Sequence, residues 1–258
     1  MNFFFQVKVT IHTIYPSSLV ITEKNSLKSG TILNTSKLLM PEFTLIQQIC
    51  IWALPVLLAI TFHELAHGYV AYYCGDNTAK MFGRLTVNPI KHIDPIGTIL
   101  LPLLIGAITN FNFVIGYAKP VPVNQSQLRK PRRDMILVTI AGPLANLLMA
   151  FLWAGCFKIA TVLHPESSMA ALFLLVTARA GMMINLILAF LNLVPIPPLD
   201  GSKVVMNLLP ARQAIAYARL EPFGFLILIV LIFTNVLGYI LTPLIYGSLY
   251  ILSAIFNL

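Results

Sequence analysis

Charged residues are scarce in this chain of 258 residues, at 10% of the total, whereas a typical soluble domain carries about a quarter. Hydrophobic residues supply 58% of the sequence, and the mean hydropathy is +0.84. So few charges exclude an ordinary soluble enzyme or binding module. The composition predicts a protein that is embedded in a lipid bilayer.

Cysteine is scarce too, with three residues in the whole chain. Cys50, Cys74 and Cys156 are widely separated and form no CxxC pair. This pattern fits neither a disulfide framework nor a cysteine-based metal site. We interpret all three as small buried hydrophobic residues.

Acidic residues number 9 against 17 Lys and Arg, which gives a formal charge of +8. The basic residues lie between long apolar runs and not on one face with interleaved aromatic residues. Such a distribution is typical of membrane topology and not of nucleic-acid binding. We therefore expect the lipid bilayer as a partner and no nucleic acid.

The first 39 residues differ from the rest, because segments such as 26–36 are polar and aperiodic. They lack a basic region followed by a small-residue cleavage site, so no secretory signal is evident. We expect residues 1–39 to be a tail that is disordered or missing from the mature protein. Residues 40–221 then form a membrane-embedded core, and residues 222–258 form a C-terminal transmembrane hairpin.

Several apolar runs are long enough to cross a membrane, since a hydrocarbon core of about 30 Å requires roughly 20 helical residues. We expect an all-α polytopic membrane protein with about five or six transmembrane helices and a short β or re-entrant segment near the active site. The last run would be roughly 55 Å long as one helix, so we expect Gly238 and Pro243 to divide it. The runs are 43–74, 95–117, 134–163, 169–198 and 222–258.

The distribution of positive charge predicts orientation. Residues 118–134 hold five Lys and Arg, and residues 200–222 hold three, so both stretches should be cytoplasmic, whereas the turn 164–168 holds none. The connection 75–94 is basic as well, and a single crossing by 95–117 would place it opposite 118–134. Either the run is re-entrant or one of the charge signals misleads.

The pentapeptide His63-Glu64-Leu65-Ala66-His67 lies in the first apolar run. Histidines four residues apart share one face of a helix and can bind one metal ion, with Glu64 beside the metal but not bound to it. Ionisable residues inside a membrane span are costly and indicate function. The alternative is a pair of buried histidines that are hydrogen-bonded to neighbouring helices.

A catalytic zinc site normally has three protein ligands and one open position for water. His12 lies in the tail, His92 in the polar connection, and His164 in the turn expected to be external. Asp200 instead closes a long apolar run, Asn192-Leu-Val-Pro-Ile-Pro-Pro-Leu-Asp-Gly201, whose prolines stop regular helix. A helix broken at membrane depth should border a polar cavity. We therefore choose Asp200 as the third ligand over an ordinary solvated carboxylate.

Three motifs in this order resemble the site-2 protease family, peptidase family M50: the HELAH pentapeptide, Ala141-Gly-Pro-Leu-Ala-Asn146, and the run that ends at Asp200-Gly201. The stretches Gly83-Arg-Leu-Thr-Val-Asn-Pro89 and Gly116-Tyr-Ala-Lys-Pro-Val-Pro-Val123 are similar to a small bacterial and archaeal branch that lacks an inserted PDZ domain. The similarity extends over about residues 40–201.

The resemblance implies that His63, His67 and Asp200 are zinc ligands and that Glu64 is the general base. It implies that Asn192 assists the oxyanion or the substrate. Asn146 either lines the site and contacts the substrate or serves in helix packing, since small residues around it suit close contact between spans.

The resemblance therefore implies an intramembrane zinc metalloprotease, with residues 40–221 as its catalytic core. It would cleave transmembrane protein substrates with a water activated by Zn²⁺, as a multi-pass protein of a prokaryotic cytoplasmic membrane. The connection from Cys74 to Asp94 could add a strand that pairs with an unwound substrate. The alternatives are a transporter that moves ions or protons and a zinc-binding membrane scaffold without catalysis.

Overall fold

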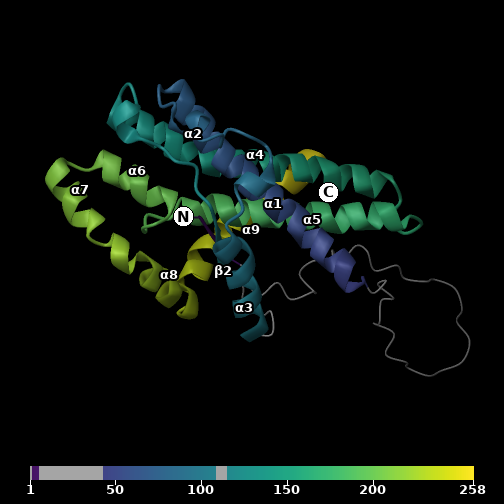
Figure 1. Cartoon of the computed structure of the whole chain (residues 1–258). Helices are drawn as coiled ribbons and strands as arrows, with labels where there is room; N and C mark the ends of the chain where they lie inside the picture. The colour runs from purple at the N-terminus through teal and green to yellow at the C-terminus, as the bar shows by residue number, and fades with distance from the viewer. Residues whose placement is uncertain (1, 6–42, 109–114) are drawn as a thin grey trace, which may run out of the picture.

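The computed structural model describes residues 2–5, 43–108 and 115–258 (Figure 1). The expected tail of residues 1–39 lies outside the described residues, except for the short strand β1 (Asn2–Phe5). The other described strand is β2 (Ile115–Ala118). The α-helices are α1 (Leu45–Tyr73), α2 (Thr78–Met81), α3 (Leu101–Ile108), α4 (Pro131–Val162), α5 (Met169–Asn192), α6 (Asp200–Leu208), α7 (Ala211–Ala218), α8 (Gly224–Phe233) and α9 (Val236–Phe256).

The described residues contain five helical segments that are long and apolar enough to cross a membrane. This confirms the expected all-α polytopic membrane protein. One of the five combines α7, a short 3-10 turn and α8, so it begins within residues 200–222, which the sequence predicted to be cytoplasmic. The segments are Ile49–Tyr73, Pro131–Val162, Met169–Asn192, Ala211–Phe233 and Val236–Phe256.

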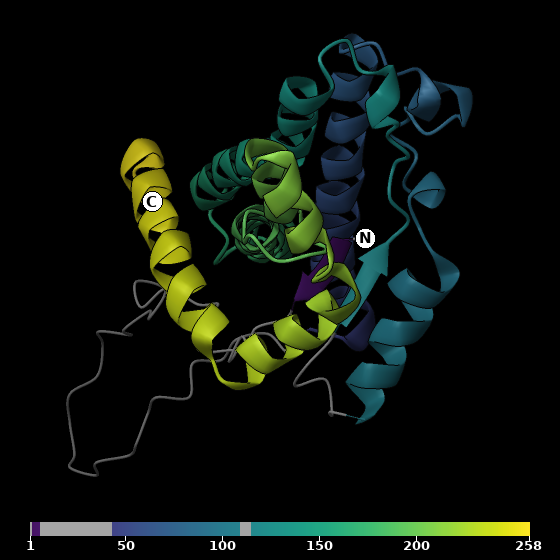
Figure 2. The same ribbon diagram turned by 90° about the vertical axis from the view of Figure 1, so that its left-hand side faces the viewer.

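Helix α5 occupies the centre of the bundle and has the most buried side chains of the five segments. It packs along α4, while α1 crosses both helices and α9 lies on the other side (Figure 2). Close approach between α4 and α5 depends on Gly181, because a Cβ there would overlap the ring of Trp153. The bundle therefore presents α1, α4 and the end of α5 to one another, which is where the predicted site residues lie.

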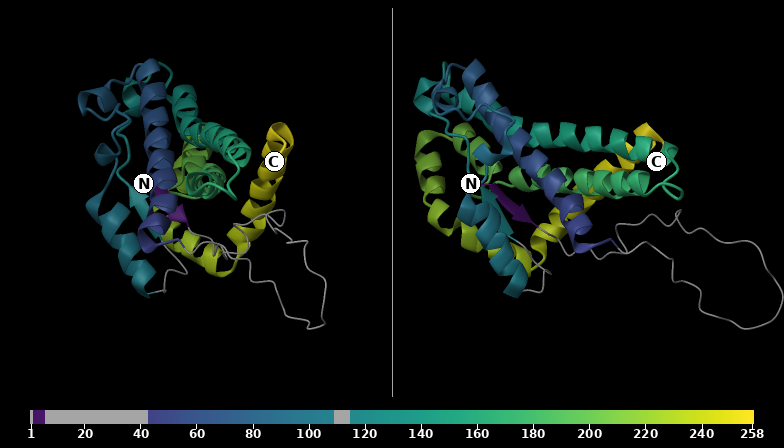
Figure 3. Two further views of the ribbon diagram at one scale, coloured as in Figure 1. Left: turned by 90° about the vertical axis from the view of Figure 1, so that its right-hand side faces the viewer. Right: turned by 45° about the vertical axis from the view of Figure 1, so that its right-hand side comes forward.

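The apolar run 95–117 does not cross the bundle. Its described helical part, a π-helical turn (Pro95–Leu100) that continues into α3, measures roughly 21 Å, short of the 30 Å of a hydrocarbon core. Strand β2 then returns alongside it (Figure 3), and the hydroxyl of Thr98 donates to the carbonyl of Tyr117 at 2.8 Å.

The two basic connections on either side of this run meet directly. The backbone N–H of Lys119 donates to the carbonyl of His92 at 3.0 Å. The run therefore starts and ends at the same end of the bundle, which makes it re-entrant. Both connections can then face the cytoplasm, so the positive-charge signals of 75–94 and 118–134 agree.

The strand near the site is β2, and the expectation of a strand between Cys74 and Asp94 is wrong. That connection forms α2, the 3-10 turn Pro89–Lys91 and bends. Asn88 and Asp94 cap successive turns through their side chains, which favours local turns over extended backbone. Strand β2 pairs antiparallel with β1, with Phe3 opposite Tyr117.

The C-terminal apolar run breaks at Asn235, so the expected division at Gly238 and Pro243 is wrong. Asn235 has a φ of 58°, in the left-handed region that asparagine tolerates better than other non-glycine residues. Pro243 lies inside α9, in keeping with the tolerance of membrane helices for proline. In the sequence, the polar pair Thr234-Asn235 within this apolar run marks the position of the break.

Sidedness provides a test of the re-entrant run. In a chain whose native cysteines are replaced, single cysteines at the exposed positions 80 and 127 should react with an impermeant maleimide from the same side of the membrane. A cysteine at exposed Glu166 should react from the opposite side, and all three should react after permeabilisation. Labelling of positions 80 and 127 from opposite sides would show that 95–117 crosses.

Candidate metal centre

Helix α1 brings the two histidines of the pentapeptide together. The rings of His63 and His67 have centroids 4.6 Å apart and planes at 87° to each other. Both side chains are buried, and their Nε2 atoms lie 3.0 Å apart. Perpendicular rings one turn apart allow both nitrogens to point at one position.

Asp200 reaches the histidines because the chain folds back after α5. Residues 193–199 are not helical, and α6 begins at Asp200. Gly201 packs onto the end of α5 so closely that a Cβ there would lie 2.6 Å from the carbonyl oxygen of Val194. The hydroxyl of Tyr217 donates to the carbonyl of Pro195 at 2.7 Å. Together these contacts return the chain to the level of α1.

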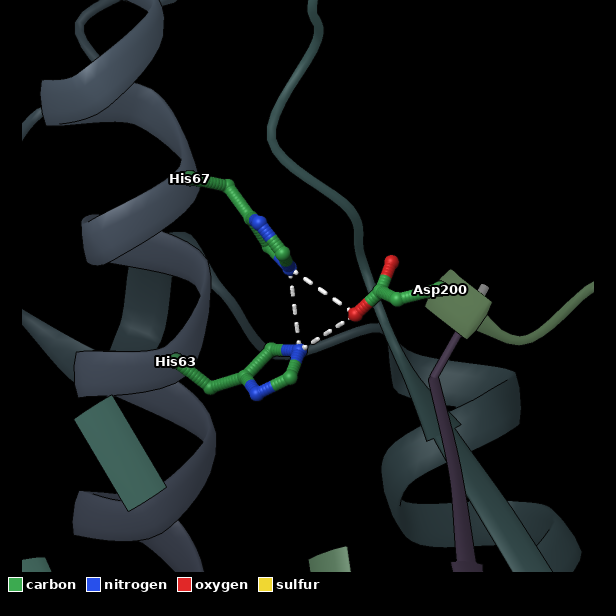
Figure 4. Close-up of side chains that lie close together, drawn as sticks. All are labelled: His63, His67 and Asp200. Atoms are coloured by element: carbon green, nitrogen blue, oxygen red, sulfur yellow. Dashed lines mark hydrogen bonds and ion pairs between the residues drawn. The ribbon is translucent and has the colours of Figure 1, made fainter. Parts of the chain in front are cut away.

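One carboxylate oxygen of Asp200 completes a triangle with the two histidines. Its Oδ2 atom lies 3.1 Å from Nε2 of His63 and 3.1 Å from Nε2 of His67 (Figure 4). All three residues are buried, and they are the group of His, Cys, Asp and Glu in the described part of the chain that could hold a metal ion.

The hydrogen bonds on the far side of each ring fix which nitrogen faces the triangle. Nδ1 of His67 lies 2.7 Å from the backbone carbonyl of Val138, which can only accept, so Nδ1 carries the proton. Nδ1 of His63 lies 2.6 Å from Oδ1 of Asn146. In neutral rings, both Nε2 atoms therefore turn lone pairs toward Asp200. Three acceptors that converge on one point need a proton or a metal ion between them.

The dimensions of the triangle fit zinc. Its centre lies roughly 1.8 Å from each atom, close to the usual zinc–ligand distance of about 2.0–2.2 Å, so these three atoms could hold one zinc ion. Histidines whose second nitrogen donates to a carbonyl are the usual ligands of such sites. Two imidazoles and one carboxylate form a donor set that is typical of catalytic zinc.

The charges around Asp200 keep its carboxylate ionised. Burial opposes ionisation, but the charge of His67 when that ring is protonated, hydrogen bonds with both histidines in that form and the charge of Lys203 outweigh it, so the pKa of Asp200 lies well below its usual range. Lys203 donates to the second oxygen, Oδ1, at 3.1 Å. This ammonium leaves Oδ2 as the oxygen that faces the histidines.

Glu64 is buried beside the histidines and is bound by the chain that leaves β2. The backbone N–H of Val121 donates to Oε2 of Glu64 at 2.7 Å. Arg84 fixes the residues just before Val121, because its guanidinium donates to the carbonyls of Lys119 at 3.0 Å and Pro120 at 3.2 Å. It also donates to the carbonyl of Lys91.

Burial lowers the pKa of Arg84, and the negative charge of Glu64 opposes this effect. Arg84 and Glu64 therefore interact in two ways. Their opposite charges attract, and Arg84 holds the backbone whose N–H at Val121 binds Glu64.

Of the other residues singled out in the sequence, Asn192 ends α5 and is buried. Its Nδ2 donates to the carbonyl of Leu188 at 2.9 Å, and its Oδ1 has no hydrogen-bond partner among the described residues. Asn146 lies against His63, as described above. His92 and His164 lie outside the cluster, and His12 falls outside the described residues.

Sequence reasoning assigned no role to Arg84, Lys203 or Val121. Arg84 and Val121 lie in the two stretches that resemble a branch of the family. That resemblance marked the stretches, but it did not indicate which groups these residues contact. Val121 acts through its backbone N–H, which every residue except proline carries, so its side chain gave no clue.

A scan against protein families matches peptidase family M50 over residues 51–162 and 153–235, which together exceed half of the chain. The chain belongs to peptidase family M50. M50 membership and the buried cluster of two histidines and an aspartate together identify a zinc metalloprotease.

Curated relatives of this M50 protein come from bacteria. "Putative zinc metalloprotease YwhC" of Bacillus subtilis (strain 168) is 40% identical over 209 residues, 78% of this chain and 90% of that protein. "Putative zinc metalloprotease Rip2" of Mycolicibacterium smegmatis is 34% identical over 188 residues, 70% of this chain and 66% of that protein. The protein of that name in Mycobacterium tuberculosis (strain H37Rv) is 30% identical over 175 residues, 68% of this chain and 63% of that protein. No solved structure matches this M50 chain.

Gly142 on α4 provides a test of the cluster, because an alanine Cβ there would lie 2.6 Å from Cε1 of His63 and 2.5 Å from Cε1 of His67. Gly142→Ala should displace both rings and weaken zinc binding about tenfold or more, measured by chelator competition on purified protein. Gly155→Ala on the same helix meets the Phe256 ring at an ordinary 3.6 Å and should bind zinc normally. Equal zinc affinity in both variants would contradict this packing.

Proposed function

We propose that this M50 protease hydrolyses peptide bonds of membrane-spanning proteins within the membrane, with zinc held by His63, His67 and Asp200. The observation that carries the proposal is the convergence of three buried acceptor atoms, two of which belong to a helix that can cross a membrane. A cluster of this kind would be strongly unfavourable in an apolar slab without a cation.

The depth of the site supports an intramembrane reaction. His67 lies roughly 9 Å from the end of α1 at Tyr73, given a rise of 1.5 Å per residue. The zinc position is therefore below the membrane surface but close to the end of the bundle that carries the basic connections. That end faces the cytoplasm in our proposal, in the cytoplasmic membrane of a prokaryote.

Glu64 is the general base in this proposal. When bound, zinc supplies Lewis acidity that lowers the pKa of water and polarises a peptide carbonyl. The carboxylate of Glu64 takes a proton from the attacking water and returns it to the leaving amine. The N–H of Val121 supports this role, because it holds Oε2 of Glu64 in place beside the histidines.

Asn192 is the residue that contacts the reacting peptide. Its Nδ2 keeps one hydrogen after donating to Leu188, and this hydrogen stabilises charge on the carbonyl oxygen as the water attacks. Its partnerless Oδ1 accepts an N–H of the unwound substrate. Asn146 has a different role, because its amide is occupied by His63 and by two further protein atoms. We propose that it orients His63 and does not bind substrate.

An extended substrate segment adds to the edge of β2. Peptide bonds within a transmembrane helix are hidden by the hydrogen bonds of that helix, so a substrate must unwind before hydrolysis. The antiparallel pairing of β1 with β2 supports this step, because an extended substrate segment could pair with β2 in the same way. The strand leads directly to Val121, whose N–H contacts Glu64.

The catalytic residues of the proposal all lie between His63 and Asp200. We therefore assign the protease activity to residues 40–221. In this division, residues 222–258 form a C-terminal transmembrane hairpin that supplies lipid-facing surface around the core.

Replacement of the proposed base separates chemistry from metal binding. Glu64→Gln should keep zinc and lower the cleavage of a single-span membrane reporter by at least about a hundredfold. Glu166→Gln, which changes an exposed glutamate in the turn between α4 and α5, should cleave normally. Undiminished cleavage by Glu64→Gln would remove the assigned base, and zinc binding without cleavage in the unmodified chain would indicate a scaffold.

Arg84 gives a second test because it holds the backbone that binds Glu64. Arg84→Met should retain zinc but lower kcat by up to about a hundredfold, as misplacement of a catalytic group by about 1 Å does. Arg132→Met removes an equal charge from an exposed position of the neighbouring basic connection and should leave kcat unchanged. Equal kcat values for the two variants would show that Arg84 does not position Glu64.

A further inference from the structure

Two buried asparagines join the three central helices behind the metal centre. Asn146 lies on α4 and Asn185 lies on α5, and neither side chain is exposed. An unpaired amide in the interior of a membrane bundle costs several kcal/mol, so the partners of each amide nitrogen and oxygen carry information. Asn185 belongs to none of the motifs that identify the family.

The direction of every hydrogen bond in this network is fixed from one end. The carbonyl of Gly181 can only accept, so the amide nitrogen of Asn185, 2.8 Å away, donates to it. Oδ1 of Asn185 therefore faces Asn146 and accepts from its Nδ2 at 3.0 Å. The same Nδ2 donates to the carbonyl of Ala59 on α1 at 3.1 Å. Oδ1 of Asn146 is thus left facing Nδ1 of His63 at 2.6 Å.

The orientation of the Asn146 amide decides which nitrogen of His63 can bind a metal. With Oδ1 toward the ring, Nδ1 carries the proton and Nε2 presents a lone pair. If the amide were turned over, Nδ2 would face Nδ1, the proton would move to Nε2, and His63 could not bind the metal through that atom. Two acceptors oppose the reversed amide, and Asn185 supplies one of them.

We propose that Asn185 is a positioning residue of the zinc site, which sets the amide of Asn146 and thereby the tautomer of His63. This inference rests on the proposed role of His63 as a ligand. Loss of the acceptor at position 185 leaves the carbonyl of Ala59 alone to hold the Asn146 amide. A fraction of the chains then carries the reversed amide, and zinc affinity falls in proportion to that fraction.

The test compares two substitutions at position 185. Asn185→Leu has a similar volume and no acceptor, and it should weaken zinc binding by about 10–100-fold, the range for partners of metal ligands. Asn185→Asp retains an oxygen toward Asn146 and should stay within about threefold. Thr177→Val removes from the same helix a buried hydroxyl that has no hydrogen-bond partner among the described residues, and it should bind zinc as the unmodified chain does. Zinc affinity is measured by chelator competition, and thermal unfolding in EDTA reports stability without metal.

A double variant separates positioning from simple helix packing. Asn146→Asp offers an acceptor to His63 in either orientation of its carboxyl group, so Asn146→Asp combined with Asn185→Leu should regain most of the lost zinc affinity. A packing role predicts the reverse, because the double variant lacks both amides that join α4 to α5.

Two results would overturn the proposal: unchanged zinc affinity in Asn185→Leu, or no recovery in the double variant. If Asn185→Leu does not fold, the rescued double variant and Asn185→Asp still decide the matter. His63→Ala tests the ligand itself. Retention of full zinc affinity by His63→Ala would contradict the proposed function, whereas its loss together with normal binding by Asn185→Leu would contradict the positioning role alone.

Discussion

The structure depends on placing three hydrogen-bond acceptors against one another inside an apolar bundle. Nε2 of His63, Nε2 of His67 and Oδ2 of Asp200 lie 3.0–3.1 Å apart, a separation that is favourable only with a proton or a metal ion between them. The surrounding groups maintain the triad: the carbonyl of Val138 and the amide of Asn146 hold the rings, and Lys203 holds the other carboxylate oxygen. Metal binding and the folding of this part of the bundle are therefore linked.

A second constraint is that irregular backbone needs partners at membrane depth. The segment 193–199 returns Asp200 to α1 because Gly201 permits close packing and Tyr217 binds the freed carbonyl of Pro195. The chain after β2 is held by Arg84, whose guanidinium donates hydrogen bonds to the carbonyls of Lys119 and Pro120. One irregular segment ends at Asp200, and the other leads to Val121, which binds Glu64. The contacts that satisfy the backbone therefore also position the side chains of the proposed site.

The sequence predicted most where a property is local. The length of the apolar runs predicted the transmembrane helices, and the spacing of His63 and His67 predicted that their rings share one face of a helix. Prediction failed where neighbouring signals competed. Gly238 and Pro243 suggested a break, but helix continues through both because Asn235 already supplies the left-handed residue. The connection from Cys74 to Asp94 was expected to add a strand, but side-chain caps at Asn88 and Asp94 favour turns.

The sequence by itself determined that this protein enters a membrane, and it supplied the histidine pair and the candidate carboxylate. Only the tertiary structure decided that 95–117 turns back, because the hydrogen bond that joins its two ends links His92 to the distant residue Lys119. Only the tertiary structure aligned the amides of Asn146 and Asn185 behind His63. Apolar periodicity and helical spacing act between near neighbours in the chain, whereas hydrogen bonds between distant segments exist only after the helices pack.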